Sequence, residues 1–128
     1  MDGQAKPSLK LMIVDDSNII RRRIERSQQL ARLRVVGAAA NGREALEVFA
    51  RTDPDVVTMD LTMPEMDGIE CVERLVAQKP GILILVVSAL ADKSTAVEAI
   101  RCGANGFLCK PFTDRQLNDA LLELLQDA

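Results

Sequence analysis

The sequence contains no histidine, no tryptophan and no tyrosine, and its aromatic residues are three phenylalanines. Without histidine, and with three cysteines that have no CxxC spacing, a zinc or copper site is not expected. With so few rings, the chain also lacks the stacking surfaces of single-stranded nucleic-acid binders. Any metal should therefore be a hard cation bound by oxygen, for which Mg²⁺ is the leading candidate and Mn²⁺ the alternative.

An excess of positive charge is also missing. The formal net charge is −3, and the basic residues are scattered except on one short segment that holds Arg21, Arg22, Arg23 and Arg26. Such a chain repels phosphate backbones, so nucleic acid is not expected as a direct partner. There is neither a signal-peptide pattern nor an apolar run of about 18 residues, which predicts a soluble, cytoplasmic protein without membrane insertion.

The 128 residues, of which 48% are hydrophobic, are enough for one domain and leave no room for a second. Residues 1–8 are predicted to form a flexible N-terminal tail, and residues 9–128 to form the domain. Cys71, Cys102 and Cys109 lie in apolar stretches and are expected to be buried, reduced thiols.

Short apolar runs alternate with segments whose apolar residues recur at helical spacing. Pro54 and Pro80 separate helical segments from strands, and Gly103 is placed to end the fourth helix. Strands are predicted at Leu9–Val14, Leu33–Ala39, Asp55–Met59, Ile82–Val87 and Gly106–Cys109. Regular alternation with nearly continuous apolar strands indicates a three-layer α/β domain, in which helices cover both faces of a parallel sheet.

Four of the predicted strands run directly into polar residues, which are Asp15 with Asp16, Asp60, Ser88 and Lys110. The carboxyl ends of parallel strands share one edge, and ligands bind there where the strand order reverses. In the common order 2-1-3-4-5, the crevice lies between the first and third strands. That order would bring the three carboxylates together.

Three neighbouring carboxylates repel one another unless a cation or an ammonium group lies among them. Lys110 can supply the ammonium and Mg²⁺ the remaining charge. A carboxylate can also accept a phosphoryl group, a reaction that requires mainly positioning and charge neutralisation. Each residue alone has an ordinary explanation, for example Asp16 or Ser17 as a helix cap, but their joint placement favours a site.

In these residues the chain resembles the receiver domains of two-component response regulators, especially CheY-like chemotaxis regulators, over Leu9 to Leu125. The matching motifs are Ile13-Val14-Asp15-Asp16-Ser17, the run Val57-Thr58-Met59-Asp60-Leu61-Thr62-Met63-Pro64-Glu65-Met66-Asp67-Gly68, Ser88-Ala89, and Gly103-Ala104-Asn105-Gly106-Phe107 leading to Lys110-Pro111-Phe112. The resemblance implies a flavodoxin-like (βα)5 fold with strand order 2-1-3-4-5.

The resemblance also implies the role of each site residue. Asp60 would be the phosphoacceptor. Asp16, Asp60 and the main-chain carbonyl of Thr62 would bind Mg²⁺ directly, with Asp15 acting through water. Ser88 and Lys110 would hold phosphoryl oxygens, Ser88 and Phe107 would form the switch, and the Lys110-Pro111 bond would be cis.

The implied phosphodonor is a histidine kinase, and the implied output surface comprises the fourth helix, the fifth strand and the fifth helix. Its target would be a flagellar motor switch or another effector, and a phosphatase would be a further partner. The segment around Asp60 also resembles the receiver of chemotaxis methylesterases, so an excised receiver of such an enzyme is an alternative origin.

Two other functional classes share parts of this pattern. A haloacid-dehalogenase-like phosphatase also uses an Asp nucleophile with Mg²⁺, but that family has Asp-x-Asp, whereas Asp15 and Asp16 are adjacent. A flavodoxin-like electron carrier would need a phosphate loop rich in Ser, Thr and Gly after the first strand. The sequence therefore favours a phosphoacceptor switch over an enzyme.

Overall fold

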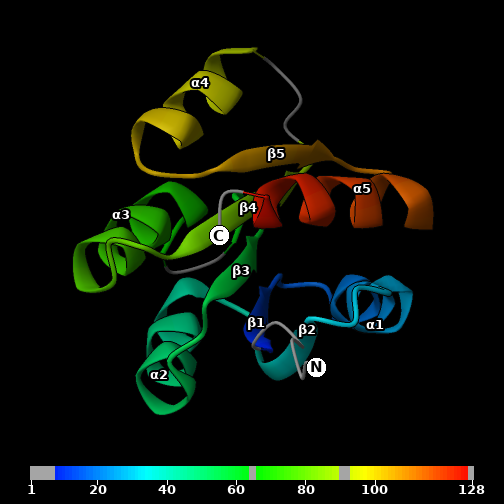
Figure 1. The fold of residues 1–128 in the computed structure, drawn as a ribbon. Helices are drawn as coiled ribbons and strands as arrows, with labels where there is room; N and C mark the ends of the chain where they lie inside the picture. The colour runs from blue at the N-terminus through cyan, green and yellow to red at the C-terminus, as the bar shows by residue number, and fades with distance from the viewer. Residues whose placement is uncertain (1–7, 64–65, 90–92, 127–128) are drawn as a thin grey trace.

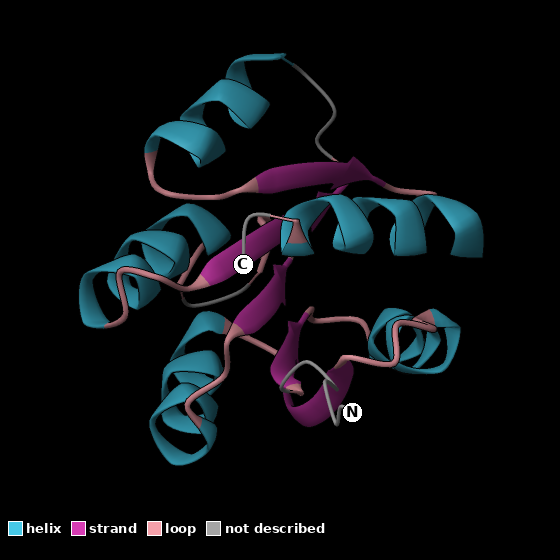
Figure 2. Cartoon of the chain, viewed as in Figure 1, coloured by secondary structure: helices cyan, strands magenta, loops and turns pink. Residues whose placement is uncertain are grey.

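The computed structural model describes residues 8–63, 66–89 and 93–126, so residues 1–7 of the predicted tail lie outside the described residues. Along this part of the chain strands and helices alternate (Figures 1 and 2). The strands are β1 (Leu9–Val14), β2 (Leu33–Ala39), β3 (Val56–Met59), β4 (Leu83–Ser88) and β5 (Gly106–Cys109). The helices are α1 (Asn18–Ser27), α2 (Gly42–Thr52), α3 (Gly68–Gln78), α4 (Lys93–Arg101) and α5 (Asp114–Leu125).

The strands form one parallel sheet in the order β2-β1-β3-β4-β5, which confirms the predicted fold class and strand order. In the register of the sheet, Val14 of β1 pairs with Met59 of β3. Each of these residues is the last of its strand, and each is followed by an aspartate. The pairing therefore brings Asp15 and Asp60 to the same level at the carboxyl edge.

Helices cover both faces of the sheet, with α1 and α5 on one face and α2, α3 and α4 on the other (Figure 1). The core is correspondingly divided into two clusters of buried aliphatic side chains, and β1, β3 and β4 contribute to both. Side chains of a strand point alternately to opposite faces, so adjacent residues such as Val56 and Val57 enter different clusters. The two layers of helices thus hold the three central strands from both sides.

Polar side chains fix where four of the helices begin. Ser17, Asn41, Asp67 and Thr113 each accept a hydrogen bond from the main-chain N–H three residues later. Such N-caps each stabilise a helix by about 1 kcal/mol, because they satisfy an otherwise unpaired N–H group. In the described part of the chain, no helix is both long enough and apolar enough to span a membrane.

Turn residues act as the sequence predicts. Helix α2 ends at Thr52, before Pro54, and α3 ends at Gln78, before Pro80. Gly103 has a φ angle of 118°, a conformation that favours glycine, and it lies two residues after Arg101, the last residue of α4.

The bounds of two strands and the burial of two cysteines differ from the expectations. β3 begins at Val56 and not at Asp55, whose side chain instead accepts a hydrogen bond from the main chain of Lys10. β4 is shifted by one residue, so Ser88 is its last residue and does not follow it. All three cysteines are free, but only Cys71 is buried. Cys109 is exposed because it ends β5, which lies at the edge of the sheet.

Candidate functional site

The predicted site residues lie at the carboxyl edge of the sheet, and main-chain hydrogen bonds fix their positions. The N–H of Asp15 donates to the carbonyl of Ala39 at 3.0 Å, and that of Asp60 donates to the carbonyl of Val14 at 2.9 Å. The N–H of Lys110 likewise donates to the carbonyl of Ser88 at 2.9 Å. The hydrogen bonding of the sheet therefore continues one residue beyond β1, β3 and β5, which gives three of these side chains a rigid base.

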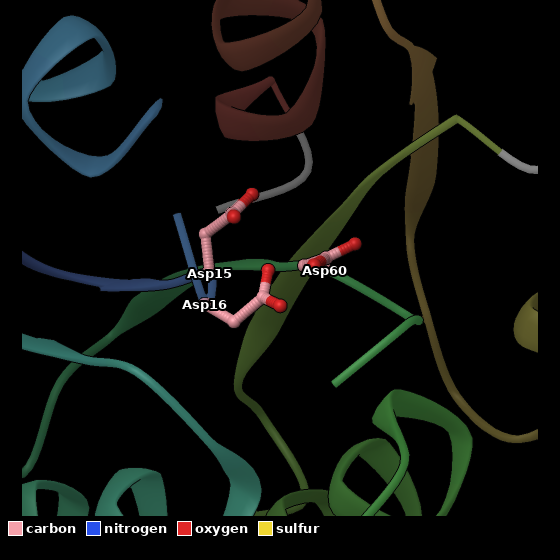
Figure 3. A group of neighbouring side chains, drawn as sticks. All are labelled: Asp15, Asp16 and Asp60. Atoms are coloured by element: carbon pink, nitrogen blue, oxygen red, sulfur yellow. The ribbon is translucent and has the colours of Figure 1, made fainter. Parts of the chain in front are cut away.

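The carboxylates of Asp15, Asp16 and Asp60 form one cluster. Each contributes an oxygen atom, and these atoms lie within 4.8 Å of one another. Figure 3 shows that Asp15 and Asp16 extend from neighbouring positions after β1, beside Asp60 after β3. Asp15 and Asp60 are buried, with exposed fractions of 1% and 3%, whereas Asp16 is exposed. The cluster is thus open to solvent at Asp16.

The ammonium group of Lys110 supplies the nearest positive charge to the two buried carboxylates. Its Nζ atom lies 2.7 Å from Oδ2 of Asp15 and 3.6 Å from Oδ1 of Asp60. The Lys110 side chain is itself largely buried, so solvent screens these contacts less than it screens surface ion pairs. One ammonium cannot neutralise three carboxylates, so the site keeps a surplus of negative charge.

Burial raises the pKa of Asp60 to about 6, and the charge of Asp15 acts in the same direction, with a smaller contribution from Asp16. Lys110 and the main-chain N–H of Thr62 oppose this rise, the latter through a 3.3 Å hydrogen bond to Oδ1. Asp60 is therefore mostly ionised at neutral pH, as a carboxylate nucleophile must be. Burial and the neighbouring carboxylates nevertheless make this ionised form less favourable than in water.

Two contacts that shape the site were not predicted from the sequence. Arg21 of α1 donates a 2.6 Å hydrogen bond to the carbonyl of Asp15, which fixes the loop after β1. Gly68 begins α3 so close to β3 that a Cβ atom there would lie 2.4 Å from the carbonyl oxygen of Asp60. The basic segment was visible in the sequence, but nothing in it indicated which arginine reaches back to the site.

The remaining predicted residues lie on or just after β3, β4 and β5. Ser88 is completely buried, and Thr62 is exposed, two residues beyond Asp60. Phe107 of β5 is half-buried and packs against the core cluster on the α2, α3 and α4 side of the sheet. The peptide bond between Lys110 and Pro111 is cis.

The donor set is suited to a hard divalent cation. Three carboxylates provide the oxygen ligands that Mg²⁺ prefers, and the surplus of negative charge favours a cation at this place. The exposed side chain of Asp16 also leaves room for the water molecules that Mg²⁺ usually retains. Asp15, Asp16 and Asp60 are therefore the residues that could hold such an ion.

Comparison with known proteins gives a consistent result. The model of the response regulator receiver domain matches residues 11–122. The chemotaxis protein CheY of Thermotoga maritima is 39% identical over 112 residues, which cover 88% of this chain and 93% of that protein. A protein-glutamate methylesterase/protein-glutamine glutaminase of Vibrio cholerae is 42% identical over 93% of this chain, which spans only 32% of that enzyme.

Structural comparison agrees with the sequence matches. The crystal structure of the response regulator domain of Thermotoga maritima CheB matches with a TM-score of 0.81 at 34% identity, covering 94% of this chain and 96% of that one. Receiver domains are signalling phosphoacceptors of two-component systems and not catalytic enzymes, so the phosphatase and electron-carrier alternatives are rejected. The chain belongs to the family of response regulator receiver domains.

Proposed function

We propose that the chain is a phosphorylation-activated switch that accepts a phosphoryl group on Asp60. The observation that carries this proposal is the environment of the Asp60 carboxylate. It follows the central strand β3, it is buried, and it lies beside Asp15, Asp16 and the Lys110 ammonium. Its pKa of about 6 keeps it ionised at neutral pH. Asp60 is thus a carboxylate nucleophile, and the Lys110 ammonium together with a cation held by the carboxylates would neutralise the charge of an incoming phosphoryl group.

In the proposed reaction, a carboxylate oxygen of Asp60 attacks the phosphorus atom of a phosphohistidine. A P–O bond forms, the P–N bond breaks, and its electron pair stays on the imidazole nitrogen of the donor, which takes up a proton. Bound Mg²⁺ would neutralise charge on the phosphoryl group. Asp15, Asp16, Asp60 and the main-chain carbonyl of Thr62 would hold this ion, for which Mn²⁺ is the alternative.

Ser88 and Lys110 would contact the phosphoryl oxygens once the group is attached. Lys110 already lies 3.6 Å from Asp60, and Ser88 is buried at the end of the neighbouring strand β4. A hydroxyl and an ammonium group provide the donors that phosphoryl oxygens require. Phe107, on the strand next to β4, would respond to movement of Ser88.

We propose a histidine kinase as the phosphodonor and a cytoplasmic role in chemotaxis or motility. The chemotaxis assignment is supported by CheY proteins of Thermotoga maritima and Listeria monocytogenes, each 39% identical over most of both chains. The target, a flagellar motor switch or another effector, would bind the surface of α4, β5 and α5. The α4 part of that surface exposes Val97 and Ile100, which supports a protein partner. A phosphatase would end the signal.

A receiver of a chemotaxis methylesterase is the second candidate, because of the 42% identity to the Vibrio cholerae enzyme. Both candidates require phosphorylation of Asp60, but they differ in the partner. Pull-down with the phosphorylated chain separates them. Capture of a motor-switch protein supports the chemotaxis regulator, whereas binding to a methylesterase catalytic domain supports the second candidate.

Incubation with acetyl phosphate and Mg²⁺, followed by intact-mass measurement, tests the central proposal. We expect a gain equal to one phosphoryl group, which is lost when EDTA replaces Mg²⁺ and absent in Asp60→Asn. Asp67→Asn is the matched control, because asparagine keeps the N-cap of α3 and this variant should be modified like the wild type. Mapping of the group to Asp53, Asp55 or Asp67 would contradict the assignment.

A further inference from the structure

Arg23 of α1 contacts the segment that immediately follows Lys110, far away in the sequence. Its Nη2 atom donates a hydrogen bond to the carbonyl of Phe112, and its guanidinium lies 4.4 Å from the centroid of the Phe112 ring. The same Nη2 atom lies 3.7 Å from Oδ1 of Asp114 at the start of α5. One side chain therefore binds the loop between β5 and α5 through three different contacts.

Among the residues that the structure describes, few others hold this loop in place. The N–H of Lys110 makes the last hydrogen bond of β5, and the next residue, Pro111, has no N–H to donate. Helix α5 then begins with the N-cap Thr113, whose side chain and main chain bond within the helix. Between these two points, the segment is held by the buried Phe112 ring and by Arg23.

Helix α1 also contacts Asp15, which forms the buried ion pair with Lys110. Arg21 donates to the carbonyl of Asp15 at 2.6 Å, and Asp15 in turn binds the Lys110 ammonium at 2.7 Å. Arg21 and Arg23 thus connect one helix to the backbone on both sides of the Asp15–Lys110 pair. The third neighbouring arginine, Arg22, is exposed and serves as an internal comparison.

We propose that Arg23 is a positioning residue that holds the Lys110 segment so that its ammonium faces the acidic cluster. The proposal rests on the function proposed for Asp60 and adds a residue that touches neither the phosphoryl group nor the metal. The ion pair with the exposed Asp114 contributes little by itself, since surface pairs are worth about 0–1 kcal/mol. The contacts to Phe112 carry the effect, because Phe112 lies two residues from Lys110.

A double-mutant cycle with Arg23→Met and Lys110→Met tests this role. Methionine keeps an unbranched apolar chain over the Phe112 ring but removes the charge and the donors. The measured quantity is the affinity for beryllofluoride at saturating Mg²⁺, by titration calorimetry, because this ion imitates a phosphoryl group on a carboxylate. We expect Arg23→Met to weaken binding about tenfold, which is about 1.4 kcal/mol. In the Lys110→Met background, the same change should have little effect.

The controls separate positioning from general stability. Arg22→Met should bind beryllofluoride like the wild type, and Mg²⁺ affinity should be the same in wild type and Arg23→Met. Arg23→Lys keeps the charge but not the planar fork, so its affinity should lie between the two. If Arg23→Met does not fold, the cycle is carried out with Arg23→Lys.

Equal weakening by Arg23→Met in both Lys110 backgrounds would overturn the proposal, because Arg23 would then act on the fold and not through Lys110. An affinity of Arg23→Met equal to that of wild type would overturn it as well. Failure of the wild type to bind beryllofluoride or to accept phosphate would instead contradict the function proposed for Asp60. The two failures are therefore distinguishable.

Discussion

The Lys110 ammonium group is bound to Asp15, with 2.7 Å between Nζ and Oδ2, although the two residues are 95 positions apart. It lies farther from Asp60, at 3.6 Å. Asp15 thus holds the Lys110 ammonium close to Asp60, the proposed phosphoacceptor. A phosphoryl group on Asp60 would compete with Asp15 for this ammonium, so Lys110 can report phosphorylation to β5.

Lys110→Met should destabilise the metal-free protein, because it leaves the buried Asp15 without its positively charged partner. Removing one member of a buried pair costs about 3–5 kcal/mol, and the partial exposure of Lys110 should reduce this to about 2–3 kcal/mol. Urea unfolding in EDTA measures the loss, with the exposed Lys93→Met as control. Mg²⁺ should restore much of the stability, and phosphorylation should continue at a lower rate. Complete loss of phosphorylation with normal Mg²⁺ binding would make Lys110 a primary catalytic group.

Mg²⁺ should stabilise the fold by relieving repulsion among Asp15, Asp16 and Asp60. At a hundredfold excess over its dissociation constant, a ligand of the folded state adds about 2.7 kcal/mol. Asp16→Ala should raise the metal-free stability slightly, since Asp16 is exposed, while abolishing the response to Mg²⁺. Thermal unfolding with and without the ion measures both effects. A melting temperature of Asp16→Ala that still rises with Mg²⁺ as in the wild type would contradict the metal site.

Asp60 should make the metal-free protein less stable as the pH rises. Its pKa is about 6 in the fold against 3.8 ordinarily, so the folded state binds the proton more tightly. The stability contribution is therefore present at low pH and is lost as the pH rises towards about 6. At 1.36 kcal/mol per pKa unit, the loss amounts to about 3 kcal/mol. Asp60→Asn should not lose this stability, because asparagine has no carboxyl group to ionise.

Urea unfolding of wild type and Asp60→Asn in EDTA, from about pH 4 to about pH 7, measures the difference between the two proteins. Asp60→Asn should be the more stable protein near neutral pH, and the gap should narrow towards pH 4. Carboxylates that do not interact with Asp60 titrate equally in both proteins and cancel. A gap that stays constant over this range would show that burial does not raise the pKa of Asp60.

Sequence and structure agree where neighbouring strands determine the positions of residues. Asp15, Asp60 and Lys110 could be placed together because each follows a strand, and the parallel sheet brings those ends to one edge. The strand order itself came from the family resemblance. Apolar periodicity then determined which faces of the helices enter the core.

Long polar side chains could not be placed from the sequence in the same way. Asp53 and Asp55 both accept hydrogen bonds from Lys79 at the end of α3, a partner that nothing in the sequence indicated. Lys79 is the largest cause that lowers the pKa of Asp53. A flexible side chain of this length can reach many partners, and local spacing does not select among them.

Gly68→Ala should disturb the site, because its Cβ atom would lie 2.4 Å from the carbonyl oxygen of Asp60 and 2.5 Å from Cα of Leu61. Both are main-chain atoms that cannot move aside cheaply. Such overpacking costs about 1–3 kcal/mol, and we expect slower phosphorylation as well. Gly81→Ala is the control, since no atom lies within 4 Å of its added Cβ. Equal stability and phosphorylation rates in the two variants would show that close packing at Gly68 is not required.

Phe107 should couple phosphorylation to partner binding. It lies on β5 beside β4, which ends at Ser88, and it packs against the core cluster while remaining half-buried. If phosphoryl oxygens draw Ser88 towards Asp60, space opens beside β4 that the Phe107 ring can enter. The surface formed by α4, β5 and α5 then changes. Shifting such an equilibrium from about 1:99 to about 99:1 requires about 5.5 kcal/mol of differential binding, to which Ser88, Lys110 and the metal would all contribute.

Phe107→Ala should therefore still be phosphorylated on Asp60 but should bind its partner equally with and without the phosphoryl group. Leu108→Ala is the matched control, because Leu108 is the next residue of β5 and packs against the opposite core cluster. In the wild type, phosphorylation should change amide exchange in α4 and β5 more than in α2, and Phe107→Ala should reduce that difference. Phosphate-dependent binding by Phe107→Ala that matches the wild type would mean that another element transmits the signal, because the ring would then have no part in remodelling the partner surface.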